Sequence, residues 1–147
     1  MNQTKELYVC EVVPTYRKKS KMKAKRLVTN LETYDFITKI FPKKEMNLRE
    51  VFGAIFLDQS LNTKGYNIIT YGGISQSVVC VKQLLQNALI CNSSGIIIFH
   101  NHPSGNNLPS QADIKVSKEI KKACEAISMR LIDSIIITEN GINSIKF

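Results

Sequence analysis

The sequence predicts a single α/β domain built on a mixed central β-sheet with helices packed on both faces. Segments rich in β-forming side chains alternate along the chain with amphipathic segments of helical period. Residues 95–99 form a continuous apolar run of strand length, which is typical of a strand covered on both faces. A chain of 147 residues that is 44% hydrophobic can bury one sizeable core but hardly two, so one domain is expected.

Local signals define the first two elements. Residues 7–13 are rich in β-formers and stop at Pro14, which predicts a strand. Residues 29–32 (Thr-Asn-Leu-Glu) have the form of a capping box, and a helix is expected from there until Pro42 stops it. The apolar positions that recur at helical spacing in this segment are Leu31, Tyr34, Ile37 and Phe41.

A hairpin and a second helix are expected next. Residues 51–57 form a short apolar run suited to a buried strand, residues 58–65 are rich in turn formers, and residues 66–71 predict the hairpin partner. After the Gly72-Gly73 break, an amphipathic helix is expected from Ser77 until residues 92–95 end it.

The last third of the chain predicts one more helix and two strands. A helix begins near Ser110, and its predicted inward positions are Ala112, Val116, Ile120, Ala123 and Ile127. Strands are expected over residues 131–138 and 142–147, joined by a Glu139-Asn140-Gly141 turn.

The formal net charge of +8 comes from one segment, because residues 17–26 contain seven basic side chains and no acid. In an extended conformation, alternation would place Arg17, Lys19, Lys21, Lys23 and Lys25 on one face. Such a stripe could bind nucleic-acid phosphates without sequence specificity. The alternative is an edge strand or loop that lysines protect from aggregation, which the lack of interleaved aromatic side chains favours.

The cysteines and the hydropathy pattern exclude several classes of protein. Cys10, Cys80, Cys91 and Cys124 are far apart and form no C-x-x-C pair, which argues against a zinc ribbon, a redox motif or a disulfide framework. No apolar run approaches the length needed to cross a bilayer. A cytoplasmic protein without a membrane partner is therefore expected.

A candidate metal site follows the central strand. His100 and His102 are the two histidines of the chain, and side chains two residues apart in extended backbone point the same way. Asp113, in the first turn of the next helix, could supply a third ligand. Three protein ligands plus a water is the arrangement of catalytic zinc. The alternative is structural, since Ser110 and Asp113 also form a legitimate S-x-x-D capping box that needs no metal.

These residues also carry a family resemblance. His100-x-His102 followed at fixed spacing by Ser110 and Asp113 resembles the metal-binding motif of the JAMM (JAB or MPN+) metalloprotease superfamily. Residues 100–105 (His-Asn-His-Pro-Ser-Gly) resemble its RadC branch in particular. The resemblance implies a cytidine-deaminase-like JAB/MPN fold over residues 29–147, preceded by a basic extension over residues 1–28.

The resemblance also implies roles for single residues. His100, His102 and Asp113 match the zinc ligands, Ser110 matches the serine that hydrogen-bonds the reacting oxygen, and Glu50 matches the acid/base glutamate, although Glu45 lies only five residues away. One departure is Ser134, which stands where RadC proteins usually have a histidine.

The implied function is zinc-dependent hydrolysis of a peptide or isopeptide bond in a peptide or protein substrate that the sequence does not identify. The historical association of RadC proteins with DNA repair finds no support in the chemistry of the site. The alternative function is a nucleic-acid-associated module whose zinc site is structural or vestigial. The distance between Glu50 and the metal would discriminate between the two.

Overall fold

The computed structural model describes residues 22–72 and 77–147, with the backbone alone for residues 77–80, and the single residues 9, 11, 13, 15 and 17. Lys19 and Lys21 of the basic segment lie outside these residues, as does much of the strand predicted over residues 7–13. The described Val9, Glu11 and Val13 belong to no strand.

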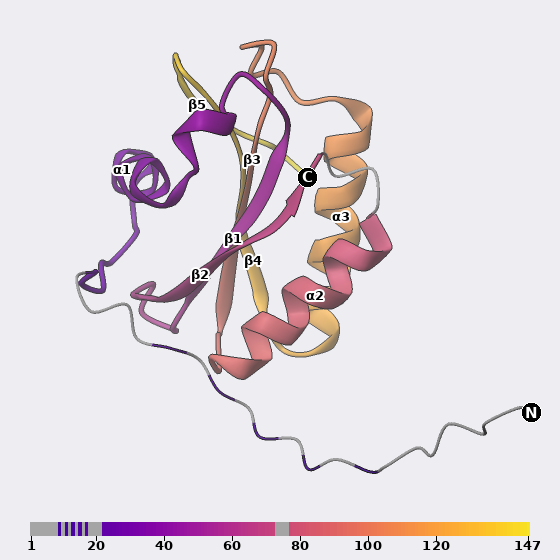
Figure 1. Cartoon of the computed structure of the whole chain (residues 1–147). Helices are drawn as coiled ribbons and strands as arrows, with labels where there is room; N and C mark the ends of the chain where they lie inside the picture. The colour runs from indigo at the N-terminus through magenta and orange to yellow at the C-terminus, as the bar shows by residue number, and fades with distance from the viewer. Residues whose placement is uncertain are drawn as a thin grey trace, which may run out of the picture.

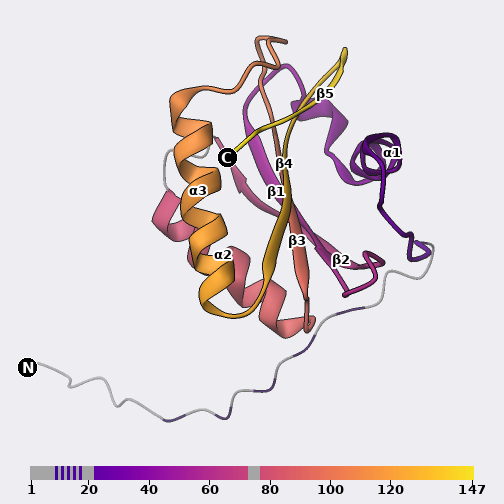
Figure 2. The ribbon, with the colours of Figure 1, turned by 180° about the vertical axis from the view of Figure 1, so that it is seen from behind.

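A five-stranded sheet forms the centre of the domain, in the order β2-β1-β3-β4-β5. The strands are β1 (Val51–Leu57), β2 (Thr63–Tyr71), β3 (Gly95–Asn101), β4 (Arg130–Thr138) and β5 (Gly141–Ser144). Only β3 and β4 pair in parallel and the other three pairings are antiparallel, so the sheet is mixed. Helix α1 (Asn30–Ile40) covers one face, and α2 (Ser77–Ile90) and α3 (Gln111–Ala126) cover the other (Figures 1 and 2). The predicted fold class is confirmed.

The central strands β1 and β3 are buried along their whole length, as the apolar runs predicted. Alternation along β3 sends Ile96 and Ile98 into the core cluster beneath α2 and α3, whereas Ile97 and Phe99 enter the cluster beneath α1. The strand continues two residues beyond the predicted Phe99, through His100 and Asn101. The first candidate ligand therefore stands within the sheet.

Both predicted capping boxes are present. Thr29 caps α1 and Ser110 caps α3, each with reciprocal bonds to the third helical residue. The inward face of α3 differs from the prediction, because Ala112 and Ile127 are exposed whereas Asp113, Ser117 and Cys124 are buried. Hydrophobic periodicity missed this face because it begins with polar residues that belong to the site.

The end of the basic segment lies against the start of β2. The Thr63 amide donates to the Lys25 carbonyl at 2.8 Å, and the Leu27 amide donates to the Leu61 carbonyl at 2.9 Å. Leu27 is buried beneath α1. This pairing agrees with an edge segment for residues 25–27, and the nucleic-acid role of the basic stripe stays a prediction.

Two further expectations concern the cysteines and the membrane. Cys91 and Cys124 are free thiols in the core, and burial, assisted by the nearby Glu125 carboxylate, raises the pKa of Cys124 to about 11. Such a thiol stays protonated and unreactive at neutral pH. Among the helices that the structure describes, none is both long and apolar enough to cross a bilayer.

Candidate metal centre

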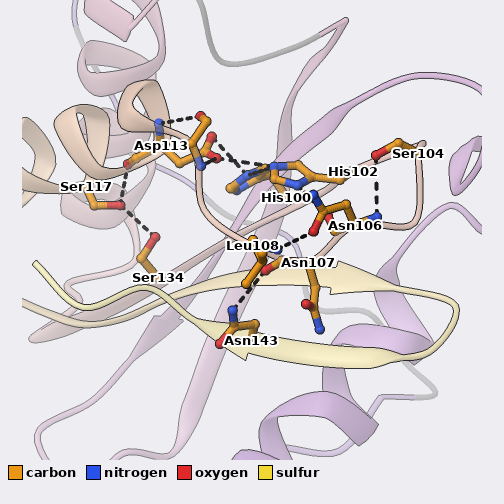
Figure 3. A network of polar contacts seen from close by, with 11 residues as sticks. His100, His102, Ser104, Asn106, Asn107, Leu108, Asp113, Ser117, Ser134 and Asn143 are labelled. Atoms are coloured by element: carbon orange, nitrogen blue, oxygen red, sulfur yellow. Dashed lines mark hydrogen bonds and ion pairs between the residues drawn. The ribbon is translucent and has the colours of Figure 1, made fainter.

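Three side chains converge at the carboxyl end of β3. His100 is the penultimate residue of β3, His102 lies just beyond the strand, and Asp113 is in the first turn of α3. Figure 3 shows both imidazole rings directed toward the Asp113 carboxylate. One ligand atom from each residue lies within 4.8 Å of the other two. The structure thus brings together the three residues that the sequence predicted as metal ligands.

The distances between the ligand atoms fit a single small cation. The two Nε2 atoms of His100 and His102 are 3.0 Å apart. Asp113 Oδ1 lies 3.2 Å from His100 Nε2, and Oδ2 lies 3.3 Å from His102 Nε2. Tetrahedral zinc with bonds of about 2.0–2.2 Å places neighbouring ligand atoms about 3.3 Å apart. The three side chains could therefore hold such an ion with small adjustments.

The orientation of His102 is fixed by the loop that follows it. His102 Nδ1 lies 2.7 Å from the Asn106 carbonyl, which can only accept a hydrogen bond, so Nδ1 is the protonated nitrogen. A neutral His102 then presents the lone pair of Nε2 to the site, as a metal ligand must. The loop is anchored from β5, where Asn143 Nδ2 donates to the Asn107 carbonyl at 2.9 Å (Figure 3).

Asp113 is held as a carboxylate. Its burial would by itself raise the pKa, but hydrogen bonds from His100 and from Ser110 outweigh burial and hold the pKa of Asp113 well below its usual range. A second set of contacts secures its backbone, because Ser117 Oγ donates to the Asp113 carbonyl at 2.8 Å and lies 2.8 Å from Ser134 Oγ on β4. Ser134, the departure noted in the sequence, thus helps to tie the first turn of α3 to the sheet.

The capping box and the metal site coexist. The Ser110 amide donates to Asp113 Oδ2 at 2.7 Å, and the Asp113 amide donates to Ser110 Oγ at 3.1 Å. A carboxylate has about four acceptor positions, so the cap leaves Asp113 able to bind a cation. The Ser110 hydroxyl accepts in the cap, and its own proton remains available to a ligand. The two interpretations left open by the spacing are therefore compatible.

Replacing Ser110 by alanine should lower the free energy of unfolding by about 0.5–2 kcal/mol, because the Asp113 amide loses its acceptor at the helix start. Urea denaturation would measure the change. Ser110→Thr should retain most of the stability. Ser104→Ala is the matched control, since Ser104 Oγ in the preceding loop accepts only a long 3.4 Å bond. Equal stability of Ser110→Ala and the unaltered protein would contradict the capping role.

Glu50 lies immediately before β1 and is half-buried. Phe52 pairs with His100 across the antiparallel β1–β3 ladder, and the same register continued by two residues sets Glu50 opposite His102. Its carboxylate has no hydrogen bond or ion pair with any residue in the described part of the chain. Glu45, the alternative, is engaged by Arg49 at 2.6 Å. The strand register and the unpartnered carboxylate both favour Glu50 over Glu45 as the candidate acid/base residue.

Several supporting residues were missed by the sequence analysis. Asn106 and Asn143 hold the loop of His102, and Ser117 supports Asp113, but none of them carries a local sequence signal. Asn101 is different, because a polar residue at the end of an otherwise apolar buried strand is itself a signal.

The protein is an α/β protein with a mixed β-sheet. Two histidines at the end of its central strand and one aspartate at the start of α3 form a candidate centre for one metal ion. The family comparison agrees with this class. A model described as RadC-like JAB domain matches residues 28–146, and the chain belongs to this family.

Curated relatives carry names that state no activity. The chain is 48% identical over 92 residues to a UPF0758 protein of Psychrobacter sp. strain PRwf-1, covering 63% of this chain and 41% of that protein. It is 41% identical over 93 residues to a UPF0758 protein of Haemophilus ducreyi, covering 63% of this chain and 42% of that protein. The chain therefore matches about two fifths of the length of these relatives.

Proposed function

We propose that this protein is a zinc-dependent metallopeptidase that hydrolyses peptide or isopeptide bonds. The observation that carries the proposal is the convergence of His100, His102 and Asp113, whose ligand atoms lie within 4.8 Å of one another. Two imidazole nitrogens and one carboxylate are the donor set of many catalytic zinc sites. In the described part of the chain, no further histidine, cysteine or acidic residue joins these three as a fourth ligand, which favours an open catalytic site over a closed structural one.

Each residue would have a separate task. A bound zinc ion would supply a water of pKa about 7 and would polarise the scissile carbonyl. His100, His102 and Asp113 would hold the ion. The Glu50 carboxylate would accept a proton from the attacking water and return it to the leaving amine. The Ser110 hydroxyl, exposed at the start of α3, would donate to the oxygen that becomes negative in the transition state.

Metal removal tests this proposal. Purified protein would be assayed for zinc by elemental analysis and incubated with a library of linear peptides and with isopeptide-linked dipeptides. Hydrolysis of at least one class is expected with zinc, with loss after chelation and recovery when zinc is returned. Zinc-loaded protein that cleaves neither class, or cleavage that survives chelation, would contradict the proposal.

A further inference from the structure

The buried side chain of Asn101 connects the strand that carries the candidate metal ligands to the segment that carries Glu50. Asn101 lies between His100 and His102 in the chain, and it is 0% exposed. Because successive side chains alternate, its carboxamide points away from the imidazoles and toward the segment before β1. We propose that Asn101 is a positioning residue that fixes residues 45–51, and with them Glu50, relative to the two histidines. This inference rests on the proposed function.

The carboxamide makes four polar contacts, one through its oxygen and three through its nitrogen, whose two hydrogens serve the two shorter bonds. Asn101 Oδ1 accepts from the Val51 amide at 2.6 Å. Asn101 Nδ2 donates to the Met46 carbonyl at 2.7 Å and to the Arg49 carbonyl at 3.1 Å, with a longer contact of 3.4 Å to the Glu45 carbonyl. All the partners are backbone groups whose donor or acceptor role is fixed, so the orientation of the amide group is determined.

These bonds fix Glu50 from both sides. The Arg49 carbonyl belongs to the peptide group that precedes Glu50, and the Val51 amide belongs to the peptide group that follows it. One carboxamide therefore holds both peptide planes that set the direction of the Glu50 side chain. The Glu50 carbonyl is bound in turn by the Gly72 amide at 2.7 Å. The Glu50 carboxylate has no partner among the described residues, so the backbone, which sets the direction of the Cα–Cβ bond, is what these contacts fix, and it limits the region that the carboxylate can reach.

The chemistry of the position requires asparagine. The site demands one acceptor for the Val51 amide and two donors for the Met46 and Arg49 carbonyls. An aspartate would set a carboxylate against those carbonyls, and alanine would remove the acceptor of the Val51 amide and the donors to the Met46 and Arg49 carbonyls. A group that must reach a metal-bound water needs placement to within about 0.5 Å, so loosening this segment should misplace Glu50 without removing a ligand.

Paramagnetic NMR on the cobalt-substituted protein tests the inference, because pseudocontact shifts report the position of each amide relative to the metal. In Asn101→Ala the amides of Glu50 and Val51 should change their shifts or broaden, while those of α3 keep theirs. Ser93→Ala is the matched control. Ser93 lies at the opposite end of the same ladder, where its hydroxyl binds the Leu57 amide and carbonyl and the Gly95 carbonyl. Ser93→Ala should leave the pseudocontact shifts of residues 49–51 unchanged.

Unaltered shifts of residues 49–51 in Asn101→Ala, or equal changes in Ser93→Ala, would overturn the inference. If Asn101→Ala does not fold, Asn101→Ser replaces it in the experiment, because the serine hydroxyl can occupy part of the space and donate to one carbonyl.

A metal-free readout separates this inference from the proposed function. Exchange of the Val51 amide should be slow in the unaltered protein and at least about tenfold faster in the variant. Failure of cobalt to bind overturns the proposed metal function, and the amide exchange then decides the role of Asn101.

Discussion

Changing His102 to alanine is expected to reduce bound zinc from a stoichiometric amount to background while the fold persists. The variant keeps two of the three proposed ligands, and loss of a supporting group alone typically costs 10–100-fold in metal affinity, so loss of a ligand should cost more. His102 belongs to neither core cluster, so the packing of the sheet does not depend on it. Elemental analysis and circular dichroism on one sample would measure both effects.

Leu108→Ala is the matched control for this experiment. Leu108 lies in the same loop, is 65% exposed and offers no ligand atom, so its replacement should leave zinc content unchanged. His100→Ala should also abolish zinc binding, but it removes a buried side chain and is the less selective test. Full zinc occupancy in His102→Ala would show that the ion, if present, is held elsewhere.

Changing Glu50 to glutamine is expected to keep the zinc and lose the chemistry. Glutamine retains the size of the side chain and its hydrogen-bonding reach, but it cannot accept a proton from the attacking water. Turnover of whichever peptide or isopeptide the protein cleaves should therefore fall by about 10²–10⁴-fold, with zinc content near that of the unaltered protein. Zinc content and rate would be measured on the same preparation.

Glu45→Gln is the matched control for Glu50. It removes the carboxylate that binds Arg49 at the surface, an ion pair worth little to stability, and it should leave turnover near normal. Two results would count against the assignment. Loss of zinc in Glu50→Gln would make Glu50 a ligand, and undiminished turnover would place the proton acceptor at Glu45 or another residue.

Short-range chemistry explains why so much of the fold was predictable. The strand over residues 51–57 was predicted with the bounds of β1, because a run of seven apolar residues rich in β-formers is too short for a typical helix and is typical of a strand buried on both faces. The starts of α1 and α3 were predicted because capping depends on side chains three residues apart. The two histidine ligands were predicted for the same reason, since side chains two residues apart in extended backbone point the same way, and Asp113 was predicted from its place in the first turn of the next helix.

The sequence by itself thus determined the five strands of the sheet and the three α-helices to within a few residues, the two caps and the identity of the three candidate ligands. Strand β2 begins at Thr63, three residues earlier than predicted, β5 ends at Ser144, three residues earlier than predicted, and the described residues of the strand predicted over residues 7–13 belong to no strand. Only the tertiary structure decided that Asp113 faces both imidazoles, because this depends on how α3 packs against β3 and β4. It also decided that Asn106 and Asn143 orient His102 and that Asn101 holds the segment of Glu50. The partners in these hydrogen bonds include backbone groups far away in sequence, such as the Met46 carbonyl, which lies 55 positions from Asn101. Every residue has such groups, so no side-chain pattern marks which of them the fold will bring together.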